Sequence, residues 1–167
     1  GKEISRSVPE VSCEEFAAEL KKFVGKVKQI PPMFSAVRKH GRHLYEYARK
    51  GLEVEREERE IIVYSLALVE WIEGLYPKAV LDIECSKGTY IRTLCHDLGT
   101  ELGCGAHMSN LLRMASGEFK LEDSKTLEEI EKCLASNDFS FVYNMGWGLD
   151  LPAVDMPENR LEAFKNG

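Results

Sequence analysis

The sequence predicts an α+β fold in which a mixed, mainly antiparallel sheet is flanked by helices. Ser12 and Glu15 form a capping box ahead of apolar residues at helical spacing. Residues 61–71 and 79–85 are rich in β-branched and apolar residues and are joined by a Glu-Gly turn, which predicts a hairpin. Residues 89–102 return to helical spacing. At 167 residues the chain is long enough to bury one core.

The N-terminal part contains two predicted helices and one short strand. The first helix begins at Ser12 and ends before Gly25, a residue type that commonly ends helices. Residues 27–30 predict a short strand, which the following Pro-Pro pair ends. Residues 33–41 show no period and predict a surface loop. Residues 43–50 predict a short helix that stops at a glycine.

The later elements follow the predicted hairpin. In the helix over residues 89–102, Gly99 fits poorly and Gly103 is the better stop. Residues 111–119 predict a strand or an extended segment. A second capping box opens a helix over residues 126–134.

The charge of the chain is unevenly distributed. The net charge of -6 would argue against a polyanionic partner if it were uniform. Residues 21–50, however, hold nine bases and one acid, whereas the rest of the chain holds 13 bases and 27 acids. Histidine, tyrosine and phenylalanine rings are interleaved with these bases, and proteins commonly bind folded RNA through such a combination of bases and rings. The alternative is a solvated helix face, which is the usual origin of a charge run.

The five cysteines are an odd number without a CxxC pair, which argues against a disulfide framework and predicts a reduced, cytoplasmic protein. Cysteines and histidines between residues 85 and 107 raise the alternative of a zinc site, but they lack the paired short spacings of structural zinc sites. No run approaches the roughly 18 apolar residues that a membrane helix needs, and the N-terminus lacks the apolar core of a signal peptide. We therefore expect no membrane association.

Residues 86–89 leave a predicted strand and enter a predicted helix, a place where proteins often present an anion site or a catalytic group. Tyr90 and Arg92 follow at once. The guanidinium of Arg92 suits a carboxylate or phosphate. The alternative is a structural ion pair beside a core tyrosine.

Two runs, Q-I-P-P-M-F-S-A at residues 29–36 and C-S-K-G-T-Y-I-R at residues 85–92, together with G-x-x-x-Y-E-Y-A-R-K-G at residues 41–51, resemble bacterial TruB-type tRNA pseudouridine synthases. The resemblance covers roughly residues 10–160 and implies part of the pseudouridine synthase catalytic fold. It also implies an isomerase that converts uridine-55 in the T-loop of tRNA to pseudouridine. That reaction has no redox or hydrolytic step, so no cofactor and no metal is expected.

The resemblance also implies residue roles. Tyr90 is expected to lie against the flipped-out uridine and Arg92 to orient the catalytic aspartate, so both are expected to be catalytic. Tyr90, Leu111 and Arg113 are expected to bind the substrate, with Leu111 lining the base pocket. Residues 35–62 match the thumb, an insertion that closes over the T-loop. The residues expected to contact RNA are Ser35, Arg38, Lys39, Arg42, His43, Arg49 and Lys87, with Arg38 standing where the family more often has lysine.

One family feature is missing from the chain. The nucleophilic aspartate of the family lies in a G-x-L-D-type motif, which does not occur here, and neither Asp82 nor Asp97 has the flanking residues. We therefore expect a fragment that lacks the N-terminal catalytic-aspartate half and is inactive alone, with that half as a partner besides the tRNA T-arm. Residues 1–150 are expected to be the central and later part of the catalytic domain. Residues 151–167 are expected to start a truncated, PUA-like C-terminal domain.

The intact protein is expected to be a monomer. Two other functions remain open: a non-catalytic RNA-binding or tRNA chaperone module on the same scaffold, and a zinc-stabilised nucleic-acid module. A Gly-Thr-Leu-Asp-like sequence upstream would favour the enzyme, and a content of about one zinc per chain would favour the zinc-stabilised nucleic-acid module.

Overall fold

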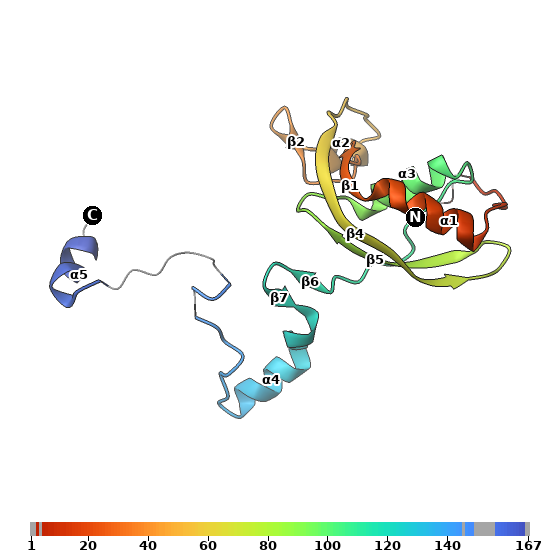
Figure 1. The fold of residues 1–167 in the computed structure, drawn as a ribbon. Coiled ribbons are helices and arrows are strands. Elements are labelled where there is room, and N and C mark those ends of the chain that lie inside the picture. The colour runs from red at the N-terminus through yellow and green to blue at the C-terminus, as the bar shows by residue number, and fades with distance from the viewer. Residues whose placement is uncertain (1–2, 4, 145, 149–155, 166–167) are drawn as a thin grey trace. The chain divides into compact units, whose positions relative to one another are not determined.

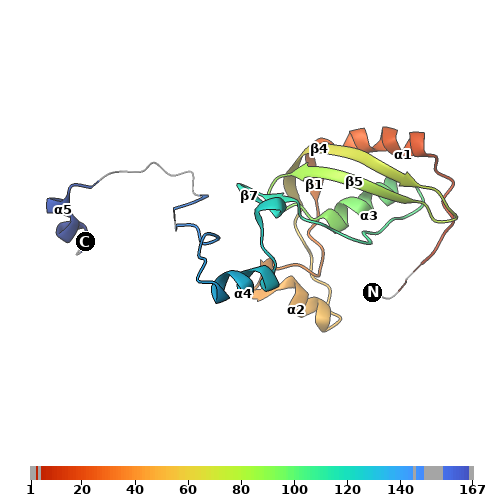
Figure 2. The same cartoon turned by 90° about the horizontal axis from the view of Figure 1, so that it is seen from below.

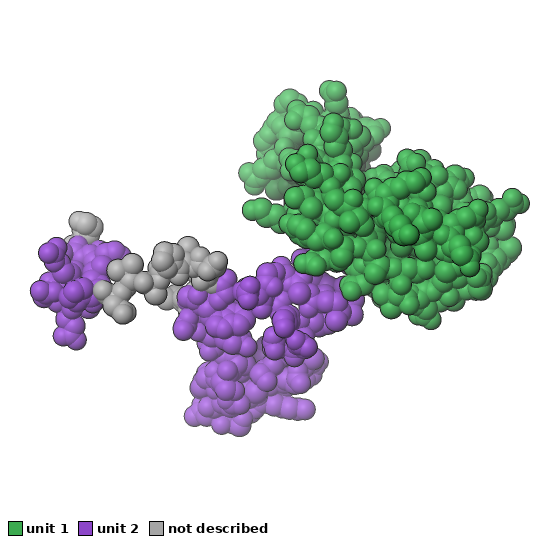
Figure 3. All heavy atoms as spheres, viewed as in Figure 1, with its two compact units in different colours: residues 1–110 green, residues 111–167 purple. Residues whose placement is uncertain are grey.

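The computed structural model describes residues 3, 5–144, 146–148 and 156–165. These residues fall into two compact units, unit 1 over residues 1–110 and unit 2 over residues 111–167 (Figure 3). None of the helices in the described part of the chain is both long and apolar enough to cross a membrane.

Unit 1 is built on a three-stranded antiparallel sheet (Figure 1). The strands are β1 (Gly25–Gln29), β4 (Arg59–Ile72) and β5 (Lys78–Cys85), in the order β1-β4-β5. The register pairs Trp71 with Ala79 next to the turn and Val63 with Cys85 at the far end. The predicted hairpin is therefore confirmed, and so is the predicted class of helices on a mainly antiparallel sheet.

Helices α1 (Cys13–Leu20) and α3 (Ile91–Glu101) cover one face of this sheet (Figure 1). The buried residues Phe16, Leu20, Phe23, Leu94 and Leu98 form the core between the two helices, and the alternate residues of β4 and β5 pack against them. The capping box predicted at Ser12 is present, since its hydroxyl accepts from Glu15 N–H and the Glu15 carboxylate accepts from Ser12 N–H. The apolar periodicity thus identified buried faces of both helices. The first helix, predicted to reach Gly25, is shorter: α1 ends at Leu20, a 3₁₀ turn follows over Lys21–Phe23, and Val24 is extended and 44% exposed.

Residues 30–58 form an insertion between β1 and β4, which are paired neighbours. Gln29 lies opposite Arg59 in the register, so the insertion leaves and rejoins the sheet at one point. It contains the short ribbon β2 (Arg38–Lys39) and β3 (Arg42–His43), then helix α2 (Leu44–Arg49). Figure 2 shows α2 lying away from the sheet. The predicted helix is confirmed, whereas the predicted loop over 33–41 includes one strand of the ribbon, because positive φ angles at His40 and Gly41 turn the chain back.

Unit 2 contains short elements. The pair β6 (Ala115–Ser116) and β7 (Phe119–Lys120) surrounds Gly117, whose φ of +59° makes the turn. The segment predicted as a strand or extended over 111–119 is therefore a small hairpin in its second half. The predicted capping box at Thr126 begins α4 (Leu127–Ala135), and α5 spans Glu158–Lys165. Residues 151–155, at the start of the predicted C-terminal domain, lie outside the described residues.

Candidate functional site

The turn between β5 and α3 is fixed by hydrogen bonds and by one glycine. Ser86 N–H donates to Ile62 O at 2.8 Å, while its hydroxyl accepts from Ile62 N–H at 2.9 Å. The Thr89 hydroxyl donates to Ser86 O at 2.8 Å. Gly88 has a φ of +84°, a conformation that other L-residues rarely adopt. The Ser-Lys-Gly-Thr run thus sets the point at which α3 begins and leaves Lys87 exposed.

Tyr90 is the N-cap of α3 and is partly buried. Its backbone is bonded on both sides by the side chain of Gln29, at the end of β1. The Gln29 carboxamide nitrogen donates to Tyr90 O at 3.3 Å, and its carboxamide oxygen accepts from Tyr90 N–H at 3.0 Å. Gln29 is 2% exposed. The start of α3 is thereby tied to the first residue before the insertion.

Arg92 lies two residues further, in the first turn of α3, and is exposed. One of its terminal nitrogens donates to the carbonyl of Phe34 at 2.7 Å, across the start of the insertion. A guanidinium has five N–H donors in a planar fork, so this contact leaves donors for an anion. Tyr90 and Arg92 thus both lie at the start of α3, and Arg92 contacts the insertion; their catalytic roles stay a prediction.

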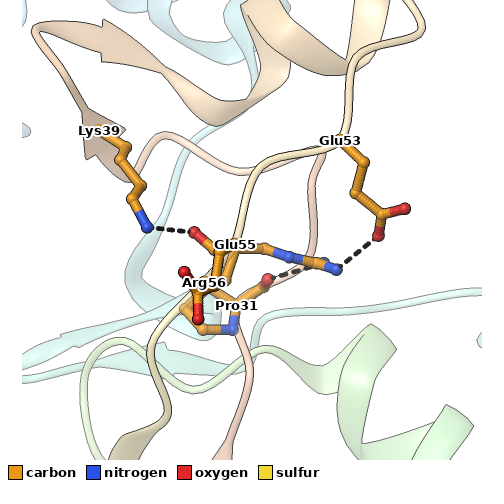
Figure 4. Close-up of polar contacts among 5 residues, drawn as sticks. All are labelled: Pro31, Lys39, Glu53, Glu55 and Arg56. Carbon is orange, nitrogen blue, oxygen red and sulfur yellow. Dashed lines mark hydrogen bonds and ion pairs between the residues drawn. The ribbon is translucent and has the colours of Figure 1, made fainter.

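The two ends of the insertion are held by polar contacts (Figure 4). Arg56 donates to Pro31 O at 3.3 Å and to the Glu53 carboxylate at 3.0 Å. The Lys39 ammonium donates to the carbonyl of Glu55 at 2.5 Å. These contacts join the outgoing chain near Pro31 and the β-ribbon to the returning chain, so the insertion is closed at its base.

The basic run is partly neutralised once the chain folds. The returning chain is rich in glutamate, and Lys26 and Lys28 of β1 pair with Glu60 at 3.0 Å and Glu58 at 3.4 Å. Within the described residues no ion pair involves the exposed bases of the ribbon and of the end of α2, which are Arg38, Arg42, Arg49 and Lys50. Within residues 21–50, the exposed bases that no ion pair among the described residues involves are therefore Lys21 and the four bases at the tip of the insertion.

Two of these bases contact aromatic rings of the insertion. His43 and Tyr45 stack with centroids 5.1 Å apart, and the Arg49 guanidinium lies 5.1 Å from the centroid of Tyr45. Arg38 Nε approaches His43 Nε2 at 3.4 Å. Ser35 differs from the other predicted RNA contacts because it is only 6% exposed. Its predicted RNA contact stays a prediction, as do those of the exposed bases.

Leu111 and Arg113 belong to unit 2 and are exposed there, Leu111 at 53%. Tyr90 belongs to unit 1, so the prediction that Leu111 lines a pocket with Tyr90 stays a prediction. The domain boundary predicted at residue 150 likewise stays a prediction.

Two titratable groups of α3, the carboxyl of Asp97 and the thiol of Cys95, have a raised pKa. Burial raises the pKa of Asp97 in α3, Glu101 raises it further, and nearby His96 opposes the change. Burial also raises the pKa of the Cys95 thiol, so it is not an activated thiolate. Among the described residues, no group of three or more His, Cys, Asp or Glu could hold a metal ion.

Sequence reasoning did not single out Gln29 or Arg56. Gln29 is the first residue of the Q-I-P-P run, and its partner Tyr90 is 61 positions away in the sequence. A polar residue at the end of an alternating strand, at a position that should be buried, is the one local signal it carries.

Comparisons with known proteins agree on one family. Residues 1–91 match the TruB family pseudouridylate synthase (N terminal domain), and residues 92–142 match the tRNA pseudouridylate synthase B C-terminal domain. The tRNA pseudouridine synthase B of Heliobacterium mobile is 45% identical over 161 residues, which are 96% of this chain and 52% of that protein. The enzyme of the same name from Listeria innocua is 48% identical over 149 residues, 87% of this chain and 49% of that protein.

Two solved structures share the fold. A Cbf5-Nop10-Gar1 complex contains a chain with a TM-score of 0.61 and 30% identity, covering 81% of this chain and 37% of that one. An H/ACA RNP bound to a substrate RNA containing 2'-deoxyuridine gives a TM-score of 0.56 and 26% identity, covering 81% and 35%. The chain spans about half the length of the curated relatives it matches. It belongs to the TruB family of pseudouridylate synthases.

Proposed function

We propose that the full-length protein isomerises uridine-55 in the T-loop of tRNA to pseudouridine, and that this chain supplies Tyr90, Arg92 and the basic insertion. The observation that carries the proposal is the exposed guanidinium of Arg92, held two residues after Tyr90 at the start of α3 and beside the insertion, in a chain 45% identical to a tRNA pseudouridine synthase B.

The chemistry explains why these groups are needed. The bond from ribose C1' to uracil N1 breaks and a bond from C1' to uracil C5 forms. The proton on C5 leaves to a base and N1 takes up a proton, so the product is an isomer of the substrate. The reacting atoms are hidden in stacked RNA, so the base must be turned out into a pocket at a cost of a few kcal/mol. An aromatic ring such as that of Tyr90 offsets this cost by stacking.

Arg92 has an electrostatic role in this proposal. An aspartate nucleophile must stay ionised in the pocket, whereas burial alone would raise its pKa. A fixed guanidinium beside the carboxylate opposes that rise and orients it. The family's nucleophile motif does not occur in this sequence, so the proposed aspartate comes from a part of the full-length protein outside these residues.

The tip of the insertion is the proposed contact with the T-arm. Among the described residues, its exposed bases without an ion pair are Arg38, Arg42, Arg49 and Lys50, and two of them contact stacked rings, Arg38 at His43 and Arg49 at Tyr45. Contacts of this type recognise phosphates and shape and weaken as salt is raised.

The test uses unmodified tRNA labelled with tritium at C5 of uracil. The full-length protein should release about one tritium per tRNA, and a transcript with cytidine at position 55 should release none. Absence of release, or release that persists with cytidine at 55, would overturn the proposal. Binding of tRNA without release would favour the chaperone alternative. Residues 1–167 alone should release no tritium, and release by that chain would show that its nucleophile lies within it.

A further inference from the structure

The carboxamide of Gln29 is an uncommon kind of anchor for a helix. It is buried and pairs with both backbone groups of one residue, donating to Tyr90 O at 3.3 Å and accepting from Tyr90 N–H at 3.0 Å. This is the pattern in which a neighbouring strand would bond a residue on both sides. Because the donor and the acceptor of the carboxamide are both used, the contact fixes the position and the orientation of the Tyr90 backbone.

Tyr90 is the residue where such fixing has most effect. It is the N-cap of α3, with φ of -99° and ψ of 101°, and its carbonyl also accepts the first helical bond from Leu94 N–H at 3.0 Å. The N–H group of an N-cap has no partner within its helix. Without Gln29, the described contacts of the Tyr90 backbone would reduce to that helical bond, and the start of α3 could shift.

A shift there would move both proposed catalytic side chains together. Arg92 follows in the first turn of α3, and its own contact runs to Phe34 O at 2.7 Å, on the same insertion that begins after Gln29. Gln29 at the end of β1 therefore holds the backbone at position 90, and Phe34 in the insertion holds the side chain at position 92.

We infer that Gln29 is a positioning residue for the proposed isomerisation. It acts by holding the Tyr90–Arg92 segment at the geometry in which the arginine meets the aspartate and the ring meets the flipped base. Its carboxamide touches neither the base nor the reacting atoms. The inference rests on the proposed function and assigns a role to a residue that is otherwise simply a buried polar group in a strand.

The test measures single-turnover tritium release by the full-length protein with Gln29→Met, which keeps the volume and removes both hydrogen bonds. A displacement of about 1 Å in a reacting group costs up to about 100-fold in rate. We expect the turnover rate to fall about 10- to 100-fold while the tRNA concentration for half-maximal rate stays within about twofold, because tRNA contacts are unchanged. Gln29→Glu keeps the acceptor for Tyr90 N–H and lacks the donor to Tyr90 O when it is ionised, so its rate should lie between those of the unchanged protein and Gln29→Met.

Val63→Ala is the matched control. Val63 is fully buried in β4 of the same sheet, its register partners are Gly25 and Cys85, and its side chain can make no hydrogen bond. A purely structural loss lowers the unfolding temperature and leaves the turnover of folded protein intact, as we expect for this variant.

A double variant separates positioning from general damage. If Gln29 acts through Arg92, Gln29→Met combined with Arg92→Lys should be no slower than Arg92→Lys alone, within about twofold. Losses that multiply, or a folded Gln29→Met with the unchanged protein's turnover, would overturn the inference. If Gln29→Met does not fold, Gln29→Glu decides in the same way. Inactivity of the unchanged protein would overturn the proposed function and this inference with it, whereas an active protein indifferent to Gln29 overturns the inference alone.

Discussion

Replacing Gly99 with alanine should destabilise unit 1, although alanine is the better helix former. Gly99 lies inside α3 and is buried. A Cβ atom at this position would lie 2.1 Å from Ala106 N, 2.4 Å from Gly105 C and 2.6 Å from Ala106 Cβ. The first two are backbone atoms, so no side-chain rotation can relieve the contacts.

The magnitude follows from three contributions. Alanine gains about 1 kcal/mol over glycine in helix propensity. Overpacking costs about 1–3 kcal/mol. Moving residues 104–106 away also weakens the bonds from Cys104 N–H and Gly105 N–H to Gly99 O, at 3.2 and 2.8 Å, each worth about 1 kcal/mol. The net expectation is a loss of about 2–4 kcal/mol, which lowers the unfolding temperature by about 10 °C or more for a unit of this size.

The assay is thermal and urea unfolding followed by circular dichroism. Thr100→Ala is the control, because Thr100 is the next residue of α3 and is exposed, so its change should stay within about 0.5 kcal/mol. A Gly99→Ala protein as stable as the original, or more stable, would refute the close packing of α3 against residues 104–106.

Three further results are expected. Arg42→Gln should weaken tRNA binding and reduce the slope of log K against log salt concentration by roughly 1. Lys28→Gln should change this slope little, because the Lys28 ammonium already pairs with Glu58. Equal changes in the two variants would contradict the tip of the insertion as the tRNA contact. Ser12→Ala should cost about 1 kcal/mol in urea unfolding because Glu15 N–H loses its cap, and no loss would argue against the capping box. Burial raises the pKa of Asp97, so the ionised carboxylate destabilises the folded protein at neutral pH. Asp97→Asn should therefore stabilise the protein by less than about 1 kcal/mol at pH 7, and the gain should shrink as the pH falls toward 3.8, the usual value for the carboxyl. A gain that does not depend on pH would contradict a raised pKa at Asp97.

Much of the fold was predictable because its signals are local. The capping boxes at Ser12 and Thr126 and the apolar faces of α1, α3 and the hairpin are read within a few residues. The need for glycine at position 99 could not be predicted from local sequence signals. Propensity predicts a poor fit at this position, and only the fold reveals that the glycine admits the backbone of residues 105 and 106.

The candidate site likewise contains residues that local sequence signals indicate and partners that they do not. Tyr90 and Arg92 stand at a strand-to-helix junction that the sequence indicates. The partners that hold them, Gln29 and the carbonyl of Phe34, are 61 and 58 positions away and have no local signature. The charge of residues 21–50 was also an incomplete guide, because Lys26 and Lys28 are neutralised by glutamates that pair only after β1 meets β4.

The most direct test of the central claim is single-turnover tritium release by the full-length protein with Arg92→Lys. Lysine keeps the positive charge but cannot present a planar fork to a carboxylate. Because Arg92 is exposed and its described contact is one bond to Phe34 O, the unfolding temperature should change little. The account predicts a rate reduced about 100-fold or more with tRNA binding preserved. A folded Arg92→Lys protein that converts uridine-55 within a few-fold of the original rate would contradict it.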